Sequence, residues 1–204
     1  MNIQQLILTV PAILFAISIH EFSHGMAAYK LGDPTAKYQG RLTLNPLAHL
    51  DPLGALMLVL FRFGWAKPVM VNPYYFKDRR RGMMLVSLAG PLANVVAAWF
   101  FRILLAFLPY QFSGQVGSVV YLFLWLNIVI NLGLAAFNLL PVPPLDGSKI
   151  LAGILPARYE FTWQRLEAYG PVILLLLLVS GIAGRLLTPI VSFLSRLISI
   201  FPAF

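Results

Sequence analysis

The sequence predicts an all-α polytopic membrane protein with about four transmembrane helices, forming a single integral-membrane domain over residues 1–204. Hydrophobic residues make up 59% of the chain and charged residues 11%, against roughly 45–50% and about 25% in soluble domains. The mean hydropathy is +0.81. Several apolar runs also reach the roughly 20 residues that a helix needs to cross a bilayer. These observations together place the chain among membrane proteins.

The apolar runs predict the transmembrane spans in chain order. Those that clearly reach the required length are residues 3–30, 83–108 and 116–140. A fourth run, within the C-terminal helical segment 171–204, is interrupted by Gly181, Gly184 and Pro189. From residue 186 onward its apolar residues recur at helical spacing. This segment therefore predicts either one short span followed by an amphipathic helix, or two short spans.

A shorter apolar run, residues 51–61, cannot cross a bilayer. The basic residues that flank it are Lys37, Arg41, Arg62 and Lys67. Because basic residues mark the cytoplasmic side, both ends favour the same side, and the run predicts a re-entrant loop. The adjoining stretches 37–44 and 66–75 alternate and carry β-formers, which predicts a small β-hairpin at the membrane edge.

The distribution of charge predicts the topology. The chain carries 15 Lys and Arg against 7 Asp and Glu. Basic residues cluster in segments 62–82 and 141–170, whereas segment 109–117 has no charge. The positive-inside rule then makes the first two segments cytoplasmic, and the third segment and the N-terminus external. We interpret the net charge of +8 as attraction to a lipid bilayer, here the cell (plasma) membrane, and not to nucleic acid.

The first span contains ionisable residues in the pattern His20-Glu21-x-x-His24. Histidines four residues apart share one face of a helix, the spacing at which two imidazoles bind one Zn²⁺ while the glutamate acts on its water. With so few His and Glu, chance produces this pattern roughly once in a thousand such sequences. The alternative is that both histidines are neutral and hydrogen-bond between helices. That alternative leaves Glu21 unexplained, since a lone carboxylate in the membrane would have to protonate.

Catalytic zinc usually takes three protein ligands, and the chain has no cysteine. The candidates for the third ligand are His49, Asp51 and Asp146. Asp146 is favoured because Pro141, Pro143 and Pro144 break a helix just before it, and non-helical backbone near the membrane is tolerated where it lines a protein or watery cavity. His49 and Asp51 remain alternatives, as supporting partners of the metal ligands or as interfacial polar residues.

Three motifs resemble those of the site-2 protease family of intramembrane zinc metalloproteases. They are HEFSH at residues 20–24, NLLPVPPLDG at 138–147 and SLAGPLANVVAA at 87–98. The resemblance covers a catalytic core of about residues 8–155 and is that of a short bacterial-type member. It implies Asp146 as the third zinc ligand, Glu21 as the general base, and Asn138 as a group that contacts the substrate or the oxyanion.

Three further asparagines lie within the predicted spans. Asn127 and Asn131 share one face of the third long span, and we expect them to hydrogen-bond between helices. For Asn94 the sequence leaves such a bond and a functional role equally open.

The sequence therefore predicts an intramembrane zinc metalloendopeptidase with one Zn²⁺ per chain, held by His20, His24 and Asp146. Its catalytic residues would be Glu21 and Asn138, at a site toward the cytoplasmic face. Its partner would be a transmembrane protein or peptide substrate, cut within or near the membrane in regulated intramembrane proteolysis. The alternatives are a zinc-binding transporter or sensor without proteolysis, and an inactive scaffold that binds transmembrane partners. The sequence does not indicate an oligomeric state.

Overall fold

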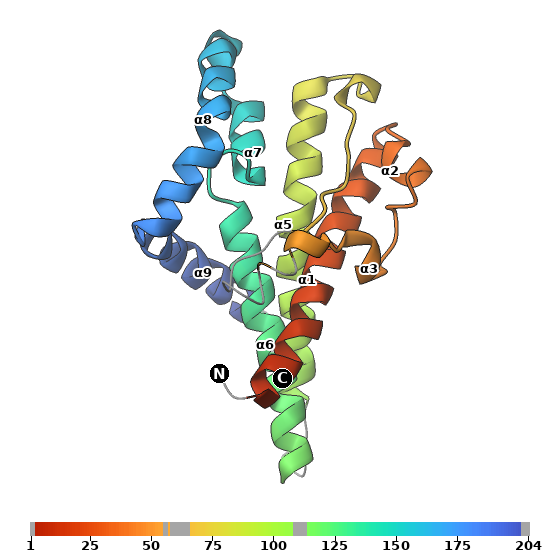
Figure 1. The fold of residues 1–204 in the computed structure, drawn as a ribbon, viewed down its shortest axis with the longest axis vertical. Coiled ribbons are helices and arrows are strands. Elements are labelled where there is room, and N and C mark those ends of the chain that lie inside the picture. Colours follow the sequence, from red (N-terminus) through yellow and green to blue (C-terminus); the bar gives the residue numbers. More distant parts are fainter. Residues whose placement is uncertain (1–2, 55–56, 58–65, 108–113, 201–204) are drawn as a thin grey trace.

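A computed structural model of the chain describes residues 3–54, 57, 66–107 and 114–200. Three long helices run side by side along the molecule (Figure 1): α1 (Ile3–Lys30), α5 (Arg79–Ala106) and α6 (Gln115–Asn138). Further elements are α2 (Thr35–Tyr38), α3 (Pro46–His49), η1 (Pro73–Tyr75), α7 (Asp146–Ile154), η2 (Ala157–Tyr159), α8 (Glu160–Val179) and α9 (Ile182–Ile200). α5 packs against α1, α6 and α7, and α9 packs against α6.

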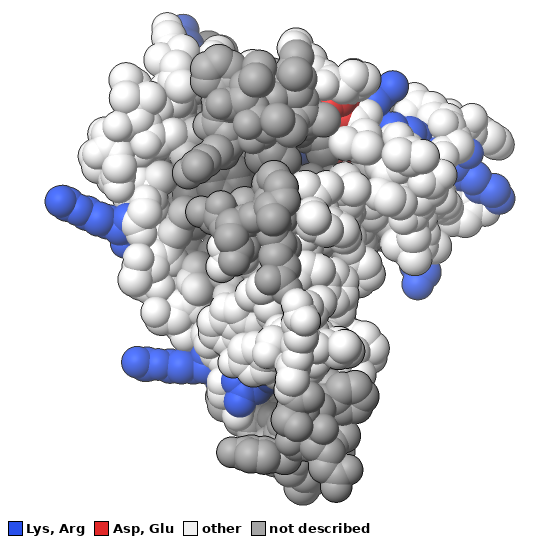
Figure 2. Space-filling view, turned by 60° about the horizontal axis from the view of Figure 1, so that its bottom comes forward, with Lys and Arg blue, Asp and Glu red and all other residues white. Residues whose placement is uncertain are grey.

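Four helices are long and apolar enough to cross a membrane: α1 from Ile7 to Lys30, α5, α6, and α9 from Ile182 to Ser199. The predicted all-α membrane fold with about four spans is thus confirmed. Figure 2 agrees, because most of the described surface on that face lacks Lys, Arg, Asp and Glu, and the basic side chains project at its margins.

The C-terminal segment differs in detail from its prediction. The run from residue 171 divides at Gly181, whose φ of 71° suits a residue without a Cβ atom. α8 begins at Glu160, earlier than the apolar run indicates. Its first half carries Glu160, Arg165 and Glu167, so the fourth apolar span is α9 and not the segment that begins at residue 171.

The predicted β-hairpin between residues 37–44 and 66–75 is wrong. Among the described residues, β pairing is limited to an isolated antiparallel bridge between Leu50 and Ala66. The buried Arg41 side chain instead donates hydrogen bonds to the carbonyl oxygens of Ala48, Lys67 and Pro68. These bonds use carbonyl groups that a hairpin would need for its ladder. The predicted re-entrant loop lies mostly at residues 55–56 and 58–65, outside the described residues.

Residues 66–72 form an extended segment, called here the cover segment, that is fixed to α3 at one end and to the turn after α1 at the other. The backbone N–H of Lys67 donates to the carbonyl oxygen of His49 at 2.9 Å. At the other end, the N–H of Asn72 donates to Oδ2 of the fully buried Asp33 at 2.7 Å. Val69, between them, is buried. The cover segment is therefore anchored at both ends by hydrogen bonds from its backbone.

The connection from α6 to α7 turns the chain back toward α1. Prolines at 141, 143 and 144 cannot continue a helix, and α6 ends at Asn138. α7 then begins at Asp146, with its first turn tight against the end of α6. A Cβ atom at Gly147 would overlap the carbonyl oxygens of Leu139 and Leu140. Only glycine fits there, and this close approach sets the position of Asp146.

Candidate metal centre

Two imidazoles from α1 and one carboxylate from α7 converge in the interior of the helix bundle. His20, His24 and Asp146 are at most 8% exposed. The Nε2 atoms of the two histidines lie 3.0 Å apart. Oδ2 of Asp146 lies 3.2 Å from Nε2 of His20 and 3.1 Å from Nε2 of His24. The structure thus brings together three residues that the sequence selects, from helices far apart in the chain.

The outward-facing ring nitrogens fix the tautomers of both histidines. Nδ1 of His20 lies 2.6 Å from Oδ1 of Asn94, and Nδ1 of His24 lies 2.7 Å from the carbonyl oxygen of Val86. Both partners are acceptors, so each Nδ1 carries the proton. The amide orientation of Asn94 is itself fixed, because its Nδ2 donates to the carbonyl oxygen of Ala16. Both Nε2 atoms are then left with a free lone pair.

The Asp146 carboxylate directs its oxygen Oδ2 at the Nε2 atoms of both imidazoles. A metal ion between Oδ2 and the two Nε2 atoms would hold this carboxyl ionised, because a carboxylate binds a metal in its deprotonated form. Oδ2 is buried and has no hydrogen-bond partner among the described residues. The position at the N-terminus of α7 also favours a negative charge.

The three atoms fit a zinc ion. Zn²⁺ with tetrahedral bonds of about 2.0–2.2 Å keeps its ligand atoms roughly 3.3–3.5 Å apart, close to the distances of 3.0–3.2 Å seen here. Two lone pairs and a carboxylate oxygen that face one another repel unless a cation lies between them. Among the described residues, this is the group of His, Asp and Glu side chains whose geometry could hold a metal ion.

α5 passes the two imidazoles at a point where only glycine fits. A Cβ atom at Gly90 would lie 2.5 Å from Nε2 of His24 and 2.7 Å from Cε1 of His20. Pro91 follows it and is fully buried. Gly90 therefore forms the wall of the candidate site as well as serving the close helix packing that its small size favours.

Glu21 lies beside the two histidines in the sequence and is held by the cover segment. Its Oε2 accepts a hydrogen bond from the backbone N–H of Val69 at 2.8 Å. This bond leaves the second carboxylate oxygen of Glu21 available to a proton. The side chain is only partly buried, as a group that exchanges protons with water requires.

The asparagines form a line that leads away from His20. Nδ2 of Asn94 donates to Oδ1 of Asn131 at 2.8 Å, so that Asn131 bonds between helices as predicted. Asn127 instead donates to the carbonyl oxygen of Phe123 in its own helix. For Asn94 the sequence left a helix-joining bond and a functional role equally open, and the structure shows contacts of both kinds. Its side chain contacts the ring of His20, a candidate ligand, and it also joins α5 to α6 through Asn131. The sequence signal that could have indicated this role is the pattern Gly90-Pro91-x-x-Asn94 in the second span.

Asn138, His49 and Asp51 do not join the three converging residues. Nδ2 of Asn138 donates to the carbonyl oxygen of Leu134 in its own helix at 3.1 Å. Nε2 of the buried His49 bonds to the carbonyl oxygen of Thr43, and Asp51 accepts from the N–H of Gly54. Among the three candidates for a third ligand, the structure brings only Asp146 to the histidines.

We predict that Asn94→Ala weakens zinc binding about 10–100-fold, the usual effect of losing a group that orients a metal-ligating histidine. The matched control is Asn127→Ala, which removes an equally buried amide bonded within its own helix. Zinc affinity of the two purified variants would be measured by competition with a chelator. Equal affinities would contradict an orienting role for Asn94.

Comparison with known proteins links the chain to one family. The family model described as peptidase family M50 matches residues 113–181. Three curated relatives share the name "Putative zinc metalloprotease". YwhC of Bacillus subtilis is 38% identical over 90% of this chain and 85% of its own. Rip2 of Mycolicibacterium smegmatis is 30% identical over 88% and 69%, and MJ0611 of Methanocaldococcus jannaschii is 34% identical over 71% and 69%. No solved structure gives a significant match.

Proposed function

The chain belongs to peptidase family M50, and from this premise we propose that it hydrolyses a peptide bond within or near a transmembrane segment of another membrane protein. It is a site-2 protease-like zinc metalloprotease and a membrane protein. Its cofactor is Zn²⁺. The location of the scissile bond and the residues that act on it form the proposal.

We assign His20, His24 and Asp146 as the protein ligands of one zinc ion. The observation that carries this assignment is the convergence of their three ligand atoms to 3.0–3.2 Å inside a bundle of membrane-length helices. When bound, Zn²⁺ supplies Lewis-acid chemistry, which polarises a carbonyl and acidifies water. The chain contributes an apolar, preorganised surrounding in which such effects are strongest.

Glu21 acts as the general base in this proposal. It takes a proton from the attacking water and passes that proton to the leaving amine. The bond from Val69 orients one carboxylate oxygen, so that the other is the oxygen that exchanges the proton. Asn138 would bind the substrate backbone or the developing oxyanion. For this, its side-chain N–H must break its hydrogen bond to the carbonyl oxygen of Leu134 and donate to the substrate instead.

The position of the site along α1 supports cleavage near the cytoplasmic face. His20 lies ten residues before Lys30 at the end of α1, which corresponds to about 15 Å along a helix. Lys30 and the basic start of α5 lie at the same end of the molecule (Figure 1). Basic residues favour the cytoplasmic side, so the N-terminus would be external, in the plasma membrane.

We expect that the purified chain, reconstituted in liposomes with a single-span substrate, cleaves that substrate until its metal is removed. Chelation should abolish cleavage, and Zn²⁺ added back should restore it, because the ligand atoms are preformed on rigid helices. Product length, read by mass spectrometry, places the cut relative to the membrane. Cleavage confined to soluble loops would refute the intramembrane proposal, and cleavage unaffected by chelation would refute the zinc mechanism.

A further inference from the structure

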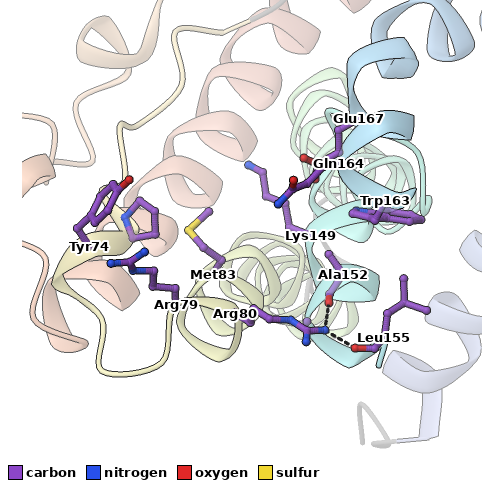
Figure 3. A pocket seen from close by; sticks show the side chains of 12 residues that line it. Tyr74, Arg79, Arg80, Met83, Lys149, Ala152, Leu155, Trp163, Gln164 and Glu167 are labelled. Atoms are coloured by element: carbon purple, nitrogen blue, oxygen red, sulfur yellow. Dashed lines mark hydrogen bonds between the residues drawn. The ribbon is translucent and has the colours of Figure 1, made fainter. Parts of the chain in front are cut away.

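A pocket with a volume of about 440 Å³ lies between the start of α5, α7 and α8 (Figure 3). None of the residues assigned to zinc or to catalysis lines it. Its charged lining residues are Arg79, Arg80, Lys149 and Glu167. Three basic side chains therefore line a cavity with a single carboxylate, and this excess of positive charge favours an anion there.

Two of the basic side chains are held in position before any ligand arrives. Nη2 of Arg80 donates to the carbonyl oxygens of Ala152 and Leu155 near the end of α7 (Figure 3). These bonds occupy one nitrogen, so the guanidinium keeps further N–H donors. The Arg79 guanidinium lies 4.3 Å from the ring centroid of Tyr74, as a cation–π contact. Neither arginine forms an ion pair with a carboxylate among the described residues.

An unpaired donor lies on the α8 side of the same pocket. Nε1 of Trp163 is buried and has no hydrogen-bond partner among the described residues. An indole nitrogen can only donate, and a buried donor without an acceptor is unfavourable. An anion with oxygen acceptors in the pocket would satisfy it. Glu167 lies on the exposed part of α8, where its repulsion of an anion is reduced by water.

We propose that this pocket binds a phosphate-bearing anion. Arginine is the residue best suited to phosphate recognition, because its planar group donates several hydrogen bonds at once. The apolar lining, which includes Pro73 and Met83, suits the carbon part of the molecule that carries the phosphate. Two sources share this chemistry: the headgroup of an anionic phospholipid and a soluble phosphate compound. The inference does not depend on proteolysis, and it would survive the failure of the proposed function.

The test uses the full chain in detergent, with native mass spectrometry of phosphatidylglycerol, phosphatidylcholine and inorganic phosphate. We expect saturable binding of phosphatidylglycerol or of phosphate, weakened at least about tenfold in the double variant Arg79→Ala/Lys149→Ala. Glu167→Gln, which removes the opposing charge, should strengthen binding. Arg80 is left unchanged because it also holds the end of α7.

The matched control is Lys77→Ala/Arg81→Ala, which removes two exposed charges near the start of α5 that do not line the pocket. Binding of phosphatidylglycerol alone identifies a lipid site, and displacement by inorganic phosphate identifies a soluble ligand. Thermal unfolding of each variant checks that the fold is retained. Equal weakening of binding in the two double variants would show that only general surface charge matters, and it would overturn the proposal. Binding of phosphatidylcholine as strong as that of phosphatidylglycerol would also overturn it, and so would the absence of saturable binding.

Discussion

Replacing Glu21 by glutamine is expected to lower proteolysis by about 10²–10⁴-fold while leaving the zinc content at the wild-type level. Glutamine keeps the shape of the side chain, and its carbonyl oxygen can still accept the hydrogen bond from Val69. The cover segment and the three ligand atoms should therefore stay in place. Glutamine cannot take a proton from water, so the loss falls on the chemical step.

The experiment compares initial rates of substrate cleavage with metal content in the same preparations. Glu160→Gln at the start of α8 is the matched control, because it removes the same charge in a helix that contributes no residue to the candidate site. Its rate should equal that of the wild type. Undiminished cleavage in Glu21→Gln would rule out Glu21 as the general base. A biological activity that survives in this variant without cleavage would favour a zinc transporter or sensor.

Gly90→Ala is expected to weaken zinc binding by at least about 100-fold, with loss of activity in parallel. The added methyl group would lie 2.5 Å from Nε2 of His24, the atom that faces the Asp146 carboxylate. One imidazole must then move away from Asp146. In a helix interior, alanine is otherwise favoured over glycine by roughly 0.5–1 kcal/mol, so helix propensity would act in the opposite direction.

Gly133→Ala is the matched control for this prediction. Gly133 also lies within a long helix, α6, but a Cβ atom there meets nothing within 4 Å. This variant should bind zinc normally and unfold at the same or a higher temperature. Zinc content by elemental analysis and cleavage of a single-span substrate would be measured for both variants. Normal zinc content in Gly90→Ala would show that the approach of α5 to the histidines is less tight than the structure gives.

The parts of the site that follow from local spacing were predictable from the sequence. His20 and His24 share a face because four residues make about one helical turn, and the length of the apolar runs indicates the spans. The proline-rich break before Asp146 marked that residue as a candidate ligand. Its selection over His49 and Asp51 depends on how α7 folds back, which spacing along the chain does not determine.

Contacts made across helices could not be predicted in this way. The bonds of His20 to Asn94 and of His24 to Val86 depend on the depth at which α5 lies against α1. The prediction of a β-hairpin was wrong for a similar reason. The alternation of residues suggested two strands, but the Arg41 side chain donates hydrogen bonds to carbonyl oxygens that those strands would have used for pairing. Strand propensity does not indicate that a buried arginine side chain will form these hydrogen bonds.

Because the proposed ligands come from α1 and α7, the complete metal site can form only late in the synthesis of the chain. A ribosome synthesises both imidazoles early, and the carboxylate follows only after α5 and α6. Until α7 emerges, the nascent chain holds a half-made ion site with two nitrogen donors, which bind zinc weakly. We therefore expect the nascent enzyme to have no proteolytic activity toward other membrane proteins until insertion of its core is nearly complete.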